Sequence, residues 1–144
     1  MEVSFYQLLK TPLEKALPKL IEKIYESGFR ALIVCDSSER IQMLNSLLWT
    51  FSQSAFIPHG YEGNPTQHPI WLSTDLANAN SANLLVVTNG SYLENTDYEK
   101  ILDIFDGNDE ESLKESRLRY QKYKEQGHTL AFWRQGETGS WEKG

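Results

Sequence analysis

Cysteine is almost absent from this chain of 144 residues, in which Cys35 is the single one. One cysteine cannot form a disulfide within the chain, and this fits a reducing compartment such as the cytoplasm. No apolar run approaches the roughly 18 residues that a membrane-spanning helix needs. The start of the chain lacks the basic residues and apolar stretch of a secretory signal. These absences predict a cytoplasmic protein.

Glycine-rich phosphate-binding motifs are also missing. The residues that follow the first predicted strand, Lys10-Thr-Pro-Leu13, contain no glycine, and no Gly-x-x-x-x-Gly-Lys-Ser/Thr sequence occurs in the chain. The three histidines, His59, His68 and His128, lie far apart and lack the spacing of paired metal ligands. We therefore expect no nucleotide, no metal and no other cofactor.

Acidic residues outnumber basic ones by 20 to 14, and the net charge of −6 argues against a surface that binds DNA as a whole. Residues 112–124 depart from this balance, because they carry five basic side chains and one acidic one. This segment contains no proline or glycine and is rich in strong helix formers, so the sequence predicts a helix.

One stripe of this predicted helix combines apolar, aromatic and cationic side chains. It consists of Leu113, Arg117, Tyr120 and Lys124, which the helical period places on one face. Such a stripe suits a ligand that carries a carboxylate beside an apolar group. The second interpretation is that cations near a helix C-terminus complement the helix dipole and stay in solvent. The stripe alone leaves both open, whereas Arg119 and Lys122 point elsewhere and are expected in solvent.

Hydrophobic spacing predicts an alternation of strands and helices. Strands are expected at residues 3–9, 31–35, 55–57, 70–72, 84–88, 101–105 and 129–133, and helices at residues 12–27, 38–49 and 112–124. Thr11 and Glu14 match a capping box, and Pro18 is expected to kink or restart the first helix. Asp36 and Ser37 are candidates to cap the second helix. The alternating order predicts an α/β fold, with one domain over residues 1–134 and a polar tail over residues 135–144.

Asp36 follows a predicted parallel strand, at the end of the sheet where α/β proteins bind ligands. His59 could come near it, which leaves open a small-molecule or nucleotide-binding enzyme that uses Asp36 and His59. The alternative is that Asp36 caps a helix and His59 makes a structural contact, since no third group completes a catalytic set. Cys35 lies within an apolar strand and is expected to be buried and unreactive.

Aromatic side chains stand among turn-forming residues in the segment Leu48-Trp49 and Ser54-Ala-Phe56-Ile-Pro-His59. Three further segments are Phe5-Tyr6, Gly28-Phe-Arg-Ala-Leu-Ile-Val-Cys35 and Arg117-x-Arg119-Tyr120-x-x-Tyr123-Lys124-x-x-Gly127. With these segments the chain resembles the chi subunit of bacterial DNA polymerase III holoenzyme over residues 5–133. The resemblance implies a single Rossmann-like α/β domain, whose mostly parallel sheet has helices on both faces and no nucleotide-binding motif.

The resemblance also implies a non-catalytic accessory subunit of the clamp-loader assembly in the bacterial cytoplasm. Members of the family bridge the acidic C-terminal tail of single-stranded DNA-binding protein to the psi subunit, and by analogy some engage a repair helicase. Such a protein would reach DNA only indirectly. Direct binding of single-stranded DNA by the basic helix is a further hypothesis, against which the net charge of −6 argues.

Two sets of side chains follow from the resemblance. The tail-binding set is Trp49, Phe105, Lys114, Arg117, Tyr120 and Lys124. The psi-binding set is Phe56, Ile57, Pro58 and His59. Arg117 is expected to bind the terminal carboxylate of the tail, and the rings are expected to contact its last aromatic residue. The family has a lysine one turn before the arginine, where this chain has Leu113 followed by Lys114. The place of Trp141 is left open.

Overall fold

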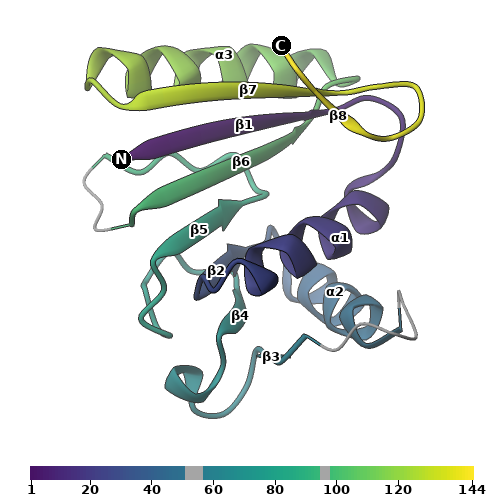
Figure 1. Ribbon diagram of the computed structural model, residues 1–144, viewed down its shortest axis with the longest axis vertical. Coiled ribbons are helices and arrows are strands. Elements are labelled where there is room, and N and C mark those ends of the chain that lie inside the picture. Colours follow the sequence, from purple (N-terminus) through teal and green to yellow (C-terminus); the bar gives the residue numbers. More distant parts are fainter. Residues whose placement is uncertain (51–56, 95–97) are drawn as a thin grey trace.

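The computed structural model describes residues 1–50, 57–94 and 98–144, and within these residues eight strands form one sheet (Figure 1). The strands are β1 (Glu2–Leu8), β2 (Ala31–Val34), β3 (His59–Gly60), β4 (Ile70–Ser73), β5 (Leu84–Val87), β6 (Lys100–Asp106), β7 (Thr129–Gln135) and β8 (Trp141–Lys143). Their order in the sheet is β3-β4-β2-β5-β6-β1-β7-β8. Neighbouring strands are parallel except β7 and β8, which are antiparallel. The predicted α/β fold with a mostly parallel sheet is confirmed.

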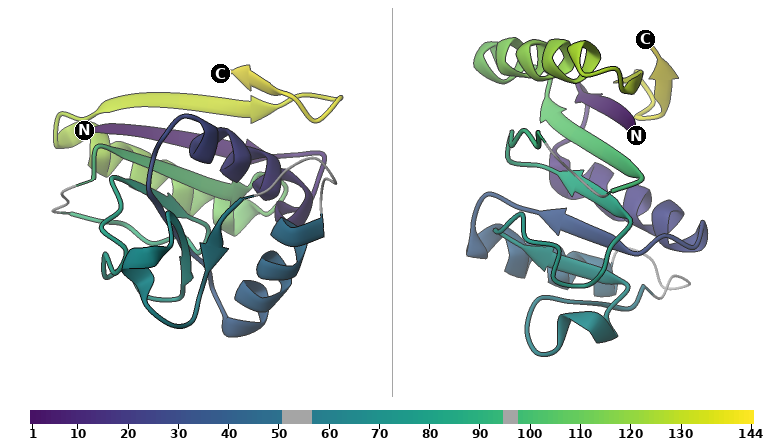
Figure 2. Two further views of the ribbon diagram at one scale, coloured as in Figure 1. Left: turned by 60° about the horizontal axis from the view of Figure 1, so that its bottom comes forward. Right: turned by 90° about the vertical axis from the view of Figure 1, so that its left-hand side faces the viewer.

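Helices cover both faces of this sheet. They are α1 (Leu13–Glu26), α2 (Ser38–Thr50) and α3 (Glu110–Glu125), with a short 3-10 helix at Pro65–Gln67. Successive strand residues face opposite sides, so Ile33 packs in the core below α1 and α2, whereas Leu32 packs in the core that includes Tyr123 of α3. Figures 1 and 2 show α3 along β7 and β1, while α1 and α2 lie over the other half of the sheet.

The N-terminal cap of α2 agrees with the sequence prediction, whereas that of α1 does not. Ser37 caps α2 as predicted, because its hydroxyl oxygen accepts a hydrogen bond of 3.2 Å from the backbone N–H of Arg40. The capping box predicted at Thr11 is wrong. The backbone N–H of Thr11 donates to Gln135 at 3.0 Å, and its hydroxyl accepts from the Gln135 amide at 2.8 Å. Pro18 is buried, and α1 runs through it from Leu13 to Glu26 as one helix, so the expected restart is not found.

Three further segments can be compared with the sequence. The strand predicted at residues 55–57 lies mostly outside the described residues, and the short strand β3 comes later, at His59–Gly60. Residues 75–83 form neither helix nor strand, as predicted. The end of the chain folds back as β8, where the Trp141 ring lies 5.0 Å from the Tyr6 ring. None of the helices in the described part of the chain is long and apolar enough to cross a membrane.

Candidate functional site

A buried ion pair fixes α3 to the sheet. Arg119 donates two hydrogen bonds to the carboxylate of Asp103 on β6, from Nε at 2.7 Å and from Nη2 at 3.0 Å. Asp103 is 1% exposed and Arg119 is 6% exposed. The expectation that Arg119 points into solvent is therefore wrong. The physical reason is that a carboxylate buried in an apolar strand needs a partner, and a planar guanidinium meets it with two bonds.

Neighbouring contacts hold the same side of α3. Burial raises the pKa of the Asp103 carboxyl above its usual value, and the hydrogen bonds from Arg119 oppose that rise. The hydroxyl of Tyr123, which is fully buried, accepts a hydrogen bond of 3.2 Å from the backbone N–H of Leu93. Lys122 is exposed, as expected, and its amino group lies 5.1 Å from the centre of the Tyr92 ring. Together these contacts decide which face of α3 is left for binding.

The predicted stripe lies along the other side of α3. Arg117 and Lys124 are exposed, and neither makes an ion pair within the described residues. Tyr120 is half-buried, and its ring centre lies 5.4 Å from that of Phe5 on β1. Phe105 is buried beneath, with its ring 6.5 Å from Phe5. The exposed cations Arg117 and Lys124 therefore share one flank of α3 with the half-buried ring of Tyr120, as the helical spacing predicts. Phe105 was added to this set by the resemblance, and the binding of a ligand by the set stays a prediction.

Phe132 also belongs to the aromatic wall formed by Phe5, Phe105 and Tyr120, although it is not among the residues predicted from the sequence. It lies on β7, half-buried, with its ring 6.4 Å from Tyr120 and 6.2 Å from Phe105. Register explains its position, because Phe132 pairs with Phe5 across β7 and β1, and paired residues face the same side of a parallel sheet. The alternation of Leu130 and Phe132 in the predicted strand was the signal that could have found it.

Lys114 lies on the outer edge of this surface. Its side chain is exposed, and the helical period of about 100° per residue puts it about 60° from Arg117 and about 120° from Tyr120. Leu113 is half-buried and packs against the core that contains Tyr123. Lys114 can therefore meet a ligand only at the periphery, next to Arg117.

Trp49 is not part of the same surface. It lies in the last turn of α2, 52% exposed, and its ring centre is 4.5 Å from that of His59. The helix α2 covers the sheet face opposite α3, near β3 and β4, whereas Arg117 and Tyr120 lie over β6, β1 and β7. The structure thus places Trp49 beside the second predicted set and apart from the tail-binding set.

The second set is largely structural where it is described. Phe56 lies outside the described residues. Ile57 is buried in the core, and Pro58 is half-buried. His59 is 5% exposed, with Nδ1 2.6 Å from the Ile57 carbonyl oxygen and Nε2 3.2 Å from that of Asn45. Among the described residues, Trp49 is a large exposed side chain next to this segment, and a partner could reach it.

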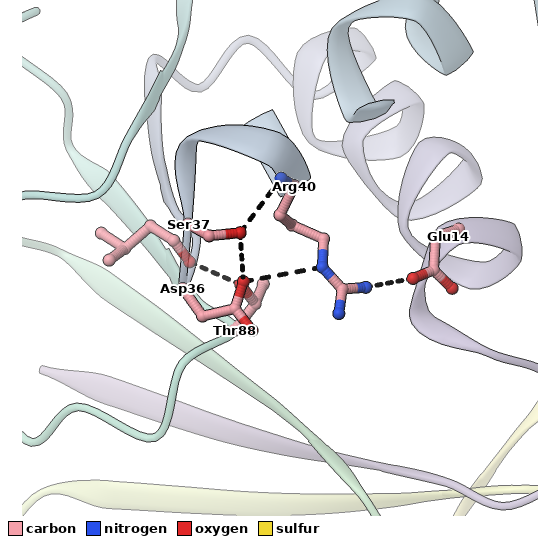
Figure 3. Close-up of polar contacts among 6 residues, drawn as sticks. Glu14, Asp36, Ser37, Arg40 and Thr88 are labelled. Carbon is pink, nitrogen blue, oxygen red and sulfur yellow. Dashed lines mark hydrogen bonds and ion pairs between the residues drawn. The ribbon is translucent and has the colours of Figure 1, made fainter. Parts of the chain in front are cut away.

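The carboxyl ends of the strands form a cleft of about 590 Å³. Figure 3 shows Asp36 there beside Ser37 and Arg40. The Ser37 hydroxyl donates to Asp36 at 3.2 Å, and Nε of Arg40 lies 3.6 Å from the same carboxylate. Arg40 also pairs with Glu14, which ties the start of α2 to α1. These side-chain contacts give Asp36 a structural role, but the residue that caps α2 is Ser37, so the expectation that Asp36 itself caps the helix is wrong.

The pair Asp36 and His59 does not form a site. His59 is paired through Ile70 with Ala31, at the amino end of β2, whereas Asp36 follows its carboxyl end. The five residue steps from Ala31 to Asp36 separate these levels by roughly 16 Å, so the expectation that His59 could come near Asp36 is wrong. Among the described residues no group of three or more His, Cys, Asp or Glu side chains could hold a metal. Cys35 is 1% exposed, and its predicted burial is confirmed.

The sequence matches a family of known proteins over most of its length. The family model described as DNA polymerase III chi subunit, HolC, matches residues 1–131. A protein of Rickettsia prowazekii (strain Madrid E) named probable DNA polymerase III subunit chi is 31% identical over 155 residues, which cover 99% of this chain and 91% of that protein. A DNA polymerase III subunit chi of Haemophilus influenzae is 32% identical over 56 residues, which cover 39% of each.

Proposed function

Because the chain belongs to the family of DNA polymerase III chi subunits, accessory subunits of DNA replication, we propose that it works as a non-catalytic adaptor in the clamp-loader assembly. One surface binds the acidic C-terminal tail of single-stranded DNA-binding protein. A second surface binds the psi subunit, and a repair helicase can use that second surface instead. The adaptor then reaches DNA through its partner.

The observation that carries the first surface is the position of Arg117 beside a half-buried aromatic wall. Tyr120 and Phe132 present ring surface at the side of α3, and Arg117 stands exposed on the same stripe. A guanidinium offers a planar fork of donors to a terminal carboxylate. An aromatic residue next to that carboxylate would pack against the rings, while Lys124 would meet acidic residues further upstream.

The balance of energies predicts modest affinity. Burying one aromatic ring contributes roughly 1.5–3 kcal/mol, and a charge-assisted hydrogen bond contributes roughly another 1.5–3 kcal/mol. The loss of translational and rotational freedom and the ordering of side chains on binding offset much of this gain. Because Arg117 and Lys124 are exposed, salt screens their attraction, and binding should weaken as ionic strength rises.

The second surface is centred on the end of α2. Trp49 is exposed there beside the ring of His59, and Met43 on the same helix is 42% exposed. An exposed tryptophan next to a rigid, buried segment is a typical binding anchor. We therefore propose that Trp49 contacts the psi subunit and not the tail. It joins Phe56 and Pro58, which already belong to the psi-binding set.

A titration with a labelled peptide tests the first surface. The peptide is acidic, ends in an aromatic residue and carries a free terminal carboxylate. Arg117→Ala should weaken binding about tenfold or more, which corresponds to about 1.4 kcal/mol. Lys122→Ala is the matched control, because it removes one charge from the same helix on the side that faces Tyr92.

Three outcomes are informative. Amidation of the peptide terminus should weaken binding to the unchanged protein much more than binding to the Arg117→Ala variant, since Arg117 recognises the carboxylate. Equal affinity for the unchanged protein and Arg117→Ala would refute the site. Equal losses in Arg117→Ala and Lys122→Ala would reduce the interaction to general attraction between opposite charges.

A further inference from the structure

A second groove lies on the sheet face opposite α3, and its floor is aromatic. Tyr6 on β1 and Trp133 on β7 are paired in register, and their rings lie 6.4 Å apart with planes only 15° from parallel. Trp141 on β8 meets Tyr6 edge-on at 5.0 Å. All three side chains are half-buried, so part of each ring remains accessible.

The hairpin that supplies Trp141 is held in place. Trp133 and Gln135 of β7 pair with β8, and the Gln135 side chain is buried. Its oxygen Oε1 accepts hydrogen bonds from the backbone N–H groups of Leu9, Lys10 and Thr11, at 3.1, 2.8 and 3.0 Å. These hydrogen bonds therefore tie the end of the chain to the loop between β1 and α1. They hold the three rings in a fixed arrangement.

The wall of the groove is cationic. The groove has a volume of about 690 Å³ and runs between the β7–β8 hairpin and α1. Lys15, Lys19 and Lys23 line it at successive helical turns, roughly 6 Å apart along the axis. In the part of the chain that the structure describes, no Asp or Glu lines the groove, although the chain has 20 acidic residues and 14 basic ones. None of the three lysines makes an ion pair within the described residues.

We propose that this groove binds single-stranded nucleic acid. A row of lysines beside a platform of aromatic rings is the combination that such ligands require, because the lysines track phosphates and the rings stack on bases. Lysine acts as a point charge toward phosphate, and no arginine, whose planar fork suits a peptide carboxylate, is among the described residues that line the groove. Thr138 and Ser140 in the hairpin turn add hydroxyl groups for phosphate or sugar contacts.

This site goes beyond the adaptor function and does not depend on it. The acidic tail is assigned to α3, whereas the groove lies on the opposite face between α1 and the hairpin. Trp133 and Trp141 follow the residues 1–131 that match the family model, so the inference rests on this chain's own side chains. It adds a direct contact with the nucleic acid strand to the indirect contact expected from the sequence.

The test titrates a labelled oligothymidylate with the purified chain at low salt and follows fluorescence anisotropy. The combined change Lys15→Gln, Lys19→Gln and Lys23→Gln should weaken binding about tenfold or more. It should also reduce the slope of log affinity against log salt by about 2, since each phosphate contact contributes roughly 0.7. The matched single-charge comparison is Lys19→Gln, which should weaken binding, against Lys122→Gln on α3, which should leave binding within about twofold because Lys122 is exposed and does not line the groove.

The ring platform is tested separately. Trp141→Ala should weaken binding about fivefold or more, whereas Trp141→Phe keeps an aromatic ring and should retain most of it. A melting curve for each variant shows that the fold is intact. The proposal is overturned if the oligonucleotide does not bind, or if Lys122→Gln loses as much affinity as Lys19→Gln. It is also overturned if a duplex of the same length binds more tightly, or if an acidic peptide occupies the groove and the oligonucleotide does not.

Discussion

Arg119 on α3 and Asp103 on β6 form a two-bond ion pair in which both side chains are buried. Residues two apart on a helix point about 200° from each other. Holding Arg119 against the sheet therefore turns Arg117 outward, beside Tyr120. The pair sets the orientation of the helix on which the proposed tail site depends.

Arg119→Ala should lower the free energy of unfolding by about 3–5 kcal/mol, because it leaves the Asp103 carboxylate buried without a partner. Chemical denaturation followed by circular dichroism measures the loss. Lys122→Ala is the control and should change stability by less than about 0.5 kcal/mol, since its side chain is exposed. Replacing both Arg119 and Asp103 by Leu should recover most of the loss, and a small effect of Arg119→Ala alone would contradict this role.

One feature of the sequence indicates the ion pair between Arg119 and Asp103. Asp103 lies in the apolar run from Ile101 to Phe105, and an acidic residue inside a covered strand almost always has a buried partner. What the sequence could not supply was the rotation of α3. If the residues assumed to face the sheet are shifted by one position, the predicted helix is rotated by about 100°. Side chains predicted in solvent then lie in the core, and the reverse.

Regular elements were easier to predict than the elements at the edges of the sheet. The apolar runs at β2 and β5 and the helical stripe of α3 are strong local patterns, and the structure has all three. The two-residue strand β3 and the short strand β8 have no such pattern, because their pairing with a neighbour defines them. The position of Trp49 depends on which sheet face α2 covers. That face is set by the tertiary topology and not by a local sequence pattern.

Trp49→Ala should separate the two proposed surfaces. We expect it to reduce co-purification of the psi subunit strongly, since it removes the large exposed ring at the end of α2. The affinity for the acidic peptide should change by less than about twofold, because Trp49 lies on the face opposite Arg117. Arg117→Ala should reduce the affinity for the acidic peptide and leave co-purification of the psi subunit unchanged. A large loss of peptide affinity in Trp49→Ala would show that Trp49 belongs to the tail site.

Cys35 should resist alkylation in the folded protein. Burial raises the pKa of its thiol from 9.0 to about 11. At about pH 8 the reactive thiolate is then roughly a hundredfold rarer than in an unfolded chain. Because the folded pKa is the higher one, the stability from the neutral thiol is fully present below about pH 9 and falls as the pH rises toward 11. Iodoacetamide labelling with and without urea measures the difference, and equal rates would contradict burial.

Gln135→Ala should loosen the C-terminal hairpin. The change removes the oxygen that accepts from the N–H groups of Leu9, Lys10 and Thr11. Leaving such groups without an acceptor costs about 1–3 kcal/mol. Hydrogen exchange at these three amides should accelerate, and the oligonucleotide affinity should fall because Trp141 is no longer held against Tyr6.

Two further variants show whether the oxygen of Gln135 is responsible. Gln135→Glu keeps an acceptor toward the three N–H groups and loses the amide donor to the Thr11 hydroxyl and to the Gly139 carbonyl oxygen. It should therefore keep the amides protected, as three converging N–H groups also suit a carboxylate. Arg134→Ala changes the exposed neighbour on β7 and should leave their exchange unchanged. If Gln135→Ala exchanges no faster than Arg134→Ala, the hairpin is held by strand pairing alone.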